Sequence, residues 1–209
     1  MTRRLDELME HPEWASRITV IDGPDGVGKS YWLKKIKEAF DANPKYTLIT
    51  MRFPENYPGA AFRDLILSKQ IEKVSAPQLL LFAADFLYGF ETIIKPALSD
   101  PNTLIVIDRF LPSTCVYQGA SLSYMNDLFK GHYPEFVDAF RRAEYIYLTP
   151  ADDEVHRQRL LSKTSDEINH FDPTTEAQRR QQIRAYWNLS LEHASIGMLE
   201  SYDVKTYAV

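Results

Sequence analysis

A chain of 209 residues is long enough to bury its own hydrophobic core, and 44% hydrophobic and 25% charged residues are typical of a globular protein. The formal net charge of −5 argues against broad non-specific binding to nucleic acid, which needs a basic face. A single cysteine, Cys115, excludes an internal disulfide and suits a reducing compartment. The charged start has no apolar signal core, and the sequence has no run of about 18 apolar residues. We therefore expect a cytoplasmic protein with no membrane and no nucleic-acid partner.

Residues 1–17 are predicted to form a short charged helix within a solvated N-terminal extension. The stretch that follows organises the rest of the chain. Residues 18–21 form a run rich in β-branched side chains. Residues 23–30 match the pattern G-x-x-x-x-G-K-S, and apolar residues at helical spacing follow them. Strand, glycine loop and helix in this order are typical of a phosphate-binding loop, whose backbone N–H groups and helix N-terminus attract phosphate.

The loop predicts a nucleoside triphosphate site, with ATP as the expected ligand. Lys29 would reach the β- and γ-phosphates, and the Ser30 hydroxyl would bind Mg²⁺. The expected ATP-binding residues are Gly23, Asp25, Gly26, Val27, Gly28, Lys29, Ser30 and Tyr31.

Predicted strands and helices alternate along the remainder of the chain. Strands are expected at residues 46–51, 103–107, 144–148 and 202–207, and helices at 60–71, from Ser75 to about 96–98, at 151–163 and at 174–193. This alternation predicts an α/β protein with the three-layer P-loop NTPase fold, in which a five-stranded parallel sheet is flanked by helices. No repeat or linker divides the sequence, so we expect residues 1–209 to form a single domain.

Polar side chains end three of the predicted strands: Asp22, Arg52, and Asp108 with Arg109. The carboxyl ends of parallel strands meet at one edge of a sheet, where ligands bind. Arg52 and Arg109 would hold a second phosphate group opposite the ATP, because a guanidinium fits phosphate as a two-pronged donor. Asp108 would either hold metal-bound water or orient the neighbouring arginine. For either arginine alone, an ordinary salt bridge is the simpler interpretation.

Residues 108–119 make the prediction more specific. Their pattern, D-R-x-x-x-S-x-x-x-Y-Q-G, resembles the thymidylate kinase family of nucleoside monophosphate kinases. The phosphate loop, the Arg52-Phe-Pro54 segment and residues 80–85 resemble that family in the same order. The resemblance implies Mg²⁺-assisted transfer of the ATP γ-phosphoryl group to dTMP, giving dTDP, by a protein that is usually a homodimer.

The resemblance also implies an acceptor site. Asp25 matches a contact to the sugar 3′-hydroxyl, while Arg52 and Arg109 match the clamp on the acceptor phosphate. Phe82 matches the aromatic residue that stacks on thymine, and Tyr117 matches the tyrosine that favours deoxyribose; core packing is the alternative for both. The remaining expected contacts to the acceptor are Phe53, Pro54, Phe86, Ser113, Thr114 and Gln118, of which Gln118 matches a residue that reads the base edge.

Two departures from the family pattern affect specificity. Phe86 stands where the family usually has an arginine that bonds the thymine O4, and phenylalanine donates no hydrogen bond. The expected acceptor is therefore dTMP, a 5-modified dUMP, or several deoxynucleoside monophosphates. The sequence also stops at Tyr207-Ala-Val209, where the family commonly continues with an adenine-contacting loop and a helix, so the adenine contacts stay open.

Residues 151–172 are expected to form the lid that closes over ATP. One subclass of the family carries a catalytic arginine in its phosphate loop, at the position of Gly26 here. The resemblance therefore implies a lid arginine instead, and Arg157 and Arg159 are the candidates, with a solvated basic face as the alternative. The histidines have no metal-ligand spacing and are predicted to be surface or packing residues: His11, His132, His156, His170 and His193.

Two other functions fit parts of this pattern. A deoxynucleoside kinase would phosphorylate a 5′-hydroxyl, but it would not need both Arg52 and Arg109. A nucleotide-binding regulatory ATPase would bind no acceptor nucleotide. It would therefore not explain why Phe82, Tyr117 and Gln118 occur together.

Overall fold

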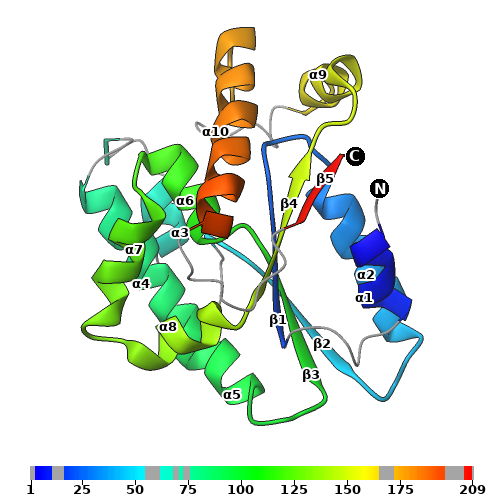
Figure 1. Ribbon diagram of the computed structural model, residues 1–209, viewed down its shortest axis with the longest axis vertical. Coiled ribbons are helices and arrows are strands. Elements are labelled where there is room, and N and C mark those ends of the chain that lie inside the picture. The colour runs from blue at the N-terminus through cyan, green and yellow to red at the C-terminus, as the bar shows by residue number, and fades with distance from the viewer. Residues whose placement is uncertain are drawn as a thin grey trace.

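The computed structural model describes residues 3–10, 17–54, 62–67, 71–72, 76–164, 172–195 and 205–208. At its centre lies a sheet of five strands in the order β2-β3-β1-β4-β5, and all neighbouring strands are parallel (Figure 1). The strands are β1 (Ile18–Asp22), β2 (Thr47–Arg52), β3 (Thr103–Asp108), β4 (Glu144–Thr149) and β5 (Lys205–Ala208). The predicted α/β class is confirmed, and each predicted strand corresponds to one of these five within a few residues.

Helices cover both faces of the sheet, so the fold has three layers (Figure 1). On one face lie α1 and α2, while α4, α6, α7, α8 and α10 pack on the other. The helices are α1 (Arg3–Glu10), α2 (Lys29–Asp41), α3 (Phe62–Leu67), α4 (Ala76–Gly89), α5 (Lys95–Ala97), α6 (Leu111–Gln118), α7 (Leu122–Lys130), α8 (Pro134–Arg141), α9 (Asp153–Leu161) and α10 (Glu176–Ser195), with the π-helical segment η2 (Phe90–Ile94) between α4 and α5.

Strand β3 shows why its sequence is a continuous apolar run. Leu104 and Val106 belong to the hydrophobic cluster under α1 and α2, whereas Ile105 and Ile107 belong to the cluster on the opposite face. Successive side chains of a strand point to opposite faces, so a strand covered on both sides needs apolar residues at every position.

Helix α1 corrects the prediction of a solvated N-terminal extension. Its side chains Leu5 and Leu8 are 0% and 2% exposed and share a cluster with Trp32 and Ile36 of α2. Residues three apart on a helix lie on the same face, and here that face covers α2. The expectation of a solvated segment was therefore wrong for this helix.

The long apolar helix predicted from Ser75 onward is present as α4, η2 and α5, which follow one another without interruption. Ser75 itself lies outside the described residues. Among the described residues, the 76–97 stretch is the one helix long and apolar enough to cross a membrane, with a mean hydropathy of 1.2 and half of it buried inside the protein. Its buried residues Phe82, Phe86 and Phe90 belong to the hydrophobic core.

The polar strand ends meet at one edge of the sheet, as predicted. Arg52 of β2 is in register with Asp108 of β3, and Asp108 is in register with Ile21, the residue before Asp22. Helix α9 leaves the end of β4 at this same edge (Figure 1).

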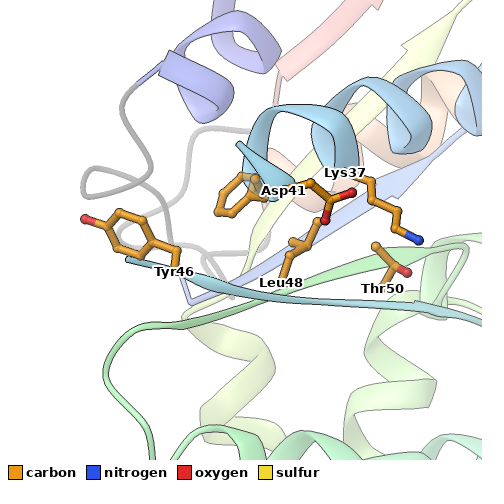
Figure 2. Close-up of a pocket in the computed structure, with 6 residues that line it drawn as sticks. Lys37, Asp41, Tyr46, Leu48 and Thr50 are labelled. Carbon is orange, nitrogen blue, oxygen red and sulfur yellow. The ribbon is translucent and has the colours of Figure 1, made fainter. Parts of the chain in front are cut away.

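A separate hollow lies between α2 and the edge strand β2 (Figure 2). Its lining residues are Lys37, Phe40, Asp41, Tyr46, Leu48 and Thr50. None of the predicted site residues lines this hollow.

We expect Gly23→Ala to destabilise the protein. Gly23 has a φ of +150°, and an added Cβ would lie 2.5 Å from the carbonyl oxygen of Leu148. A residue held at an unfavourable positive φ costs about 1–3 kcal/mol, and the contact with Leu148 adds to this cost. Urea denaturation should show a lower free energy of unfolding.

Gly131→Ala is the matched control, because Gly131 has a φ of −75° and an added Cβ would meet no atom within 4 Å. The free energy of unfolding of this variant should be unchanged or slightly higher. Equal denaturation midpoints for the two variants would contradict the close approach of Gly23 to β4.

Candidate functional site

The Asp22 carboxylate at the end of β1 joins the phosphate loop to α6. Its Oδ1 accepts hydrogen bonds from the Gly23 N–H (2.8 Å) and the Ser113 hydroxyl (2.6 Å). Its Oδ2 accepts from the backbone N–H groups of Phe110 (3.1 Å) and Ser113 (3.0 Å). Asp22 thus caps the N-terminus of a helix that lies about 90 residues away in the sequence. Burial raises the pKa of Asp22, while the bond from Ser113 and the charge of Lys29 act in the opposite direction.

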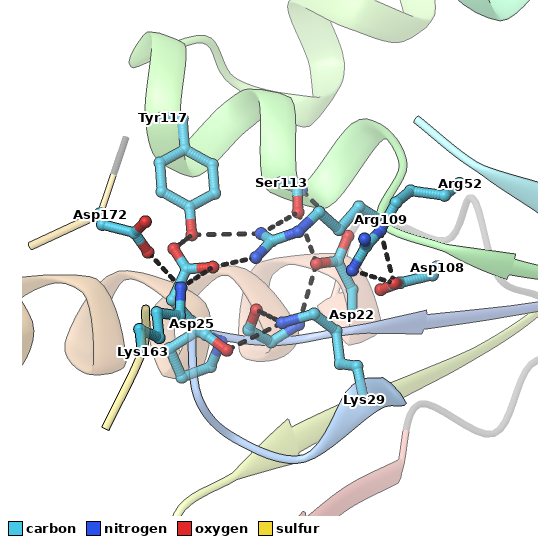
Figure 3. Close-up of polar contacts among 12 residues, drawn as sticks. Asp22, Asp25, Lys29, Arg52, Asp108, Arg109, Ser113, Tyr117, Lys163 and Asp172 are labelled. Atoms are coloured by element: carbon cyan, nitrogen blue, oxygen red, sulfur yellow. Dashed lines mark hydrogen bonds and ion pairs between the residues drawn. The ribbon is translucent and has the colours of Figure 1, made fainter. Parts of the chain in front are cut away.

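Arg109 follows β3 and directs its guanidinium toward the phosphate loop (Figure 3). Nη2 forms an ion pair with Asp25 Oδ1, and Nη1 donates to the Tyr117 hydroxyl at 3.2 Å. The Tyr117 hydroxyl in turn donates to Asp25 Oδ2 at 2.7 Å. Burial alone would raise the pKa of Asp25, but the charges of Arg109 and Lys29 outweigh it and bring that pKa to about 2. Arg109 also has a φ of +67°, which is uncommon for a residue with a side chain.

The Lys29 ammonium group is folded into its own loop. Nζ donates to the carbonyl oxygens of Gly23 (2.7 Å) and Pro24 (2.8 Å), and the residue is 5% exposed. Burial, together with the nearby charge of Arg109, lowers the pKa of Lys29 to about 8. A phosphate would be a stronger acceptor than these two carbonyls, because it carries charge.

Arg52 and Asp108 pair across the ends of β2 and β3. Nε and Nη2 of Arg52 lie 2.9 and 2.8 Å from the same oxygen, Asp108 Oδ2. The Asp108 side chain is 1% exposed and the Arg52 side chain is 48% exposed, so the aspartate fixes an arginine that reaches the surface of the site. Among the described residues, the other oxygen, Asp108 Oδ1, is buried without a hydrogen-bond partner.

These residues fit the requirements of Mg²⁺ bound with a nucleotide. Such an ion takes few protein ligands, because phosphates and water fill most of its positions. Ser30 is exposed at the first turn of α2. Asp108 Oδ1 is available to accept a hydrogen bond from metal-bound water. Within the described ranges, no group of three or more His, Cys, Asp and Glu side chains could hold a metal ion.

The phenylalanines expected to contact the acceptor belong to an aromatic cluster. Phe86 is 1% exposed, and its ring centroid lies 5.0 Å from that of Phe53 and 4.7 Å from that of Phe110. Phe82 is 7% exposed, with its centroid 6.2 Å from that of Phe86. A phenylalanine at position 86 is therefore explained by packing among aromatic rings, where a charged side chain would be buried at high cost.

Helix α6 holds the other residues expected near the base: Ser113, Thr114 and Gln118. They are buried, at 6%, 2% and 7% exposure. The Ser113 hydroxyl also bonds the Tyr186 hydroxyl of α10 at 2.8 Å, so its contacts are with the protein itself. The Thr114 hydroxyl lies 3.5 Å from the carbonyl oxygen of Phe110.

Helix α9, in the predicted lid, lies directly over the phosphate loop. A Cβ added at Gly26 would be 3.0 Å from Leu160, and one added at Gly28 would be 3.7 Å from Arg159 Nη1. Arg157 instead pairs with Glu154 at 2.6 Å, and its side chain is 45% exposed. Of the two predicted lid arginines, the structure brings Arg159 to the loop and not Arg157.

Sequence reasoning missed three residues around Asp25. Lys163 Nζ lies 2.5 Å from Asp172 Oδ1 and 4.0 Å from Asp25 Oδ1. His156, predicted only as a surface or packing residue, is 2% exposed and contacts the backbone carbonyl of Asp25. The contacts to Asp25 join residues more than 130 positions apart, so no local pattern in the sequence predicts them. The one available signal was the position of Lys163 at the end of the predicted lid helix.

Comparison with known proteins agrees with these motifs. A family model described as Thymidylate kinase matches residues 21–193, which is more than half of the chain. The thymidylate kinase of Bradyrhizobium diazoefficiens is 36% identical over 118 residues, which cover 55% of this chain and 50% of that protein. That of Chlorobium chlorochromatii is 35% identical over 103 residues, covering 49% and 46%. This chain thus spans about half the length of the curated relatives it matches.

The lowered pKa of Lys29 gives a measurable prediction. Above pH 8 much of Lys29 is neutral in the free protein, and the negative charge of a bound triphosphate would restore its protonated form. Binding of ATP at pH 8.5 should therefore take up protons, and ATP affinity should fall as the pH rises through about 8. Calorimetry in two buffers of different ionisation enthalpy measures the uptake, which Lys29→Met should abolish. Identical binding heats in both buffers would contradict the assignment.

Proposed function

Because this chain belongs to the thymidylate kinase family, we propose that it transfers the γ-phosphoryl group of ATP to a deoxynucleoside monophosphate, with dTMP as the first candidate. The observation that carries this proposal is the placement of Arg52 and Arg109 at the ends of β2 and β3, beside a phosphate loop. One phosphate-binding loop serves a donor nucleotide, and two arginines beside it suit a second phosphate group.

On the donor side, Lys29 would exchange its two carbonyl acceptors for phosphate oxygens. Ser30, and Asp108 through water, would hold Mg²⁺, which when bound supplies charge neutralisation to the triphosphate. The loop backbone around Gly26 and Gly28 would surround the phosphates with N–H groups.

On the acceptor side, Arg52 is oriented by Asp108 and would hold the acceptor phosphate together with Arg109. Asp25 and Tyr117 lie beside Arg109 and would meet the deoxyribose. An oxygen of the acceptor phosphate would then attack the γ-phosphorus in line as the bond from that phosphorus to the β,γ-bridging oxygen breaks, so that ADP leaves without a covalent enzyme intermediate. The residues contribute by positioning the two substrates and by neutralising charge.

The aromatic cluster around Phe86 bears on which base the acceptor carries. Phe86 is buried among aromatic rings and offers no donor to a base, and Phe82 lies at 7% exposure in the same cluster. We propose dTMP, a 5-modified dUMP or several deoxynucleoside monophosphates as acceptors. A homodimer and a cytoplasmic location also remain proposals that follow the family.

The test is a coupled assay of ADP release with dTMP, dUMP, 5-hydroxymethyl-dUMP, dCMP, dGMP and thymidine as acceptors. We expect turnover that depends on a monophosphate and is abolished by Lys29→Met, with circular dichroism confirming that the variant is folded. Preference for thymidine over dTMP would indicate a deoxynucleoside kinase. Hydrolysis unaffected by any monophosphate would indicate a regulatory ATPase, and either result would refute the proposal.

The two lid arginines should differ in their effect on turnover. Arg159 lies over the loop, whereas Arg157 is held by Glu154 on the exposed side of α9. Removing one preorganised donor to the transition state typically lowers kcat by about 10²–10³-fold, so we expect a loss of this size for Arg159→Ala. Arg157→Ala should stay close to the wild-type kcat. Comparable losses in both variants would show that the lid repositions itself during the reaction.

A further inference from the structure

His156 connects the lid helix to the backbone of the phosphate loop. It lies in the first turn of α9, which is capped by Asp152 through a bond from the Val155 N–H at 2.9 Å. Its Nε2 is 2.5 Å from the carbonyl oxygen of Asp25, and its Nδ1 is 2.9 Å from Nη1 of Arg179 in α10. The histidine and the arginine are 2% and 3% exposed, so both contacts are buried.

The chemistry of these partners determines the tautomer of the ring. A guanidinium group can only donate hydrogen bonds, so Nδ1 of His156 must accept the bond from Arg179. The proton of the neutral ring is then on Nε2, where it is donated to the Asp25 carbonyl. Arg179 is held in place by Asp153 and Glu176, each at 2.7 Å, so its orientation does not depend on His156.

The carbonyl that His156 contacts belongs to a peptide on which both substrate sites depend. A peptide unit is planar, so fixing the Asp25 carbonyl also fixes the direction of the Gly26 N–H in the loop. The side chain of the same Asp25 holds Arg109 and Tyr117. Helix α9 can approach this closely because position 26 is a glycine with a φ of +76°. A Cβ there would lie 3.5 Å from the His156 ring and 3.0 Å from Leu160.

We propose that His156 is a positioning residue of the phosphate loop: its neutral ring, held in one tautomer by Arg179, fixes the Asp25–Gly26 peptide relative to α9 and α10. The proposal deepens the proposed function, and only its activity measurements rest on that function. The tautomer of the ring can be measured without turnover.

Protonation would break this arrangement. A second ring proton on Nδ1 would point at the N–H groups of Arg179, and both partners would then carry positive charge. Burial lowers the pKa of His156, and the charge of Arg179 lowers it further. The bond to the Asp25 carbonyl acts in the opposite direction and is outweighed. The charged groups that act on the ring are Asp25 of the loop, Lys29 of α2, Asp153 of α9 and Arg179 of α10. Glu176 of α10 bonds Arg179 behind them. The contact should therefore persist through neutral pH and be lost in acid.

The first experiment measures the ring directly, by nitrogen NMR of the full-length protein labelled at histidine, without nucleotide. His156→Gln assigns the signal by removing it from the spectrum. We expect the Nε2–H tautomer for His156 at neutral pH, and protonation at a pH below the ordinary pKa of histidine. A ring carrying its proton on Nδ1, or a His156 pKa at or above the ordinary value of histidine, would overturn the proposal.

The second experiment separates positioning from packing by comparing His156→Gln, which can still donate to the Asp25 carbonyl, with His156→Ala, which cannot. At pH 8, His156→Ala should lower kcat/KM for ATP by up to about tenfold, mainly through KM, the effect expected for one lost hydrogen bond. His156→Gln should recover most of this loss. His132→Gln is the matched control and should follow the wild type at every pH.

The dependence on pH provides a readout that loss of packing would not produce. Phosphate groups titrate near pH 6, so the informative quantity is the ratio of kcat/KM between His156→Gln and the wild type from pH 8 to 5.5. This ratio should rise as the pH falls, because glutamine does not become charged. A constant ratio, or equal losses in the glutamine and alanine variants, would overturn the proposal. A wild type that phosphorylates no monophosphate would refute the proposed function, and the NMR result would still decide the role of His156.

Discussion

The rest of the structure depends on one buried carboxylate, Asp22. A carboxylate in a protein interior is tolerated only where donors satisfy its oxygens, and Asp22 receives four hydrogen bonds. Two come from the backbone at the start of α6, one comes from the phosphate loop and one from Ser113. Because Ser113 also bonds Tyr186, helix α10 is attached to the same point. Strand β1, the loop, α6 and α10 therefore hold a common geometry around one side chain.

Three cationic side chains meet at the carboxyl edge of the sheet, in a chain whose formal net charge is −5. Lys29 is satisfied by loop carbonyls, Arg109 by Asp25, and Arg52 by Asp108. The carbonyl contacts of Lys29 are weaker than a contact to a charged phosphate. Arg52 and Arg109 can keep their carboxylate partners and donate further hydrogen bonds to a phosphate.

Parts of the fold and of the site were predictable because their signals are local. The order of strand, glycine loop and helix identified the phosphate loop, and continuous apolar runs identified strands covered on both faces. The convergence of Asp22, Arg52 and Asp108 followed from parallel topology alone. Helix α1 was misjudged, because the burial of Leu5 and Leu8 depends on α2 and not on their own short segment.

The sequence by itself determined the chemistry that consecutive residues can encode: a phosphate loop, an α/β fold and arginines at strand ends. Only the tertiary structure decided that Arg159 and not Arg157 of α9 lies over the loop, that Phe86 packs among aromatic rings, and that His156 bonds a carbonyl 131 residues away. The physical reason is the range of the interactions. Secondary structure and loop chemistry depend on neighbours within a few residues. The tautomer of a histidine or the partner of an arginine depends on side chains that meet only when the sheet and its helices have packed.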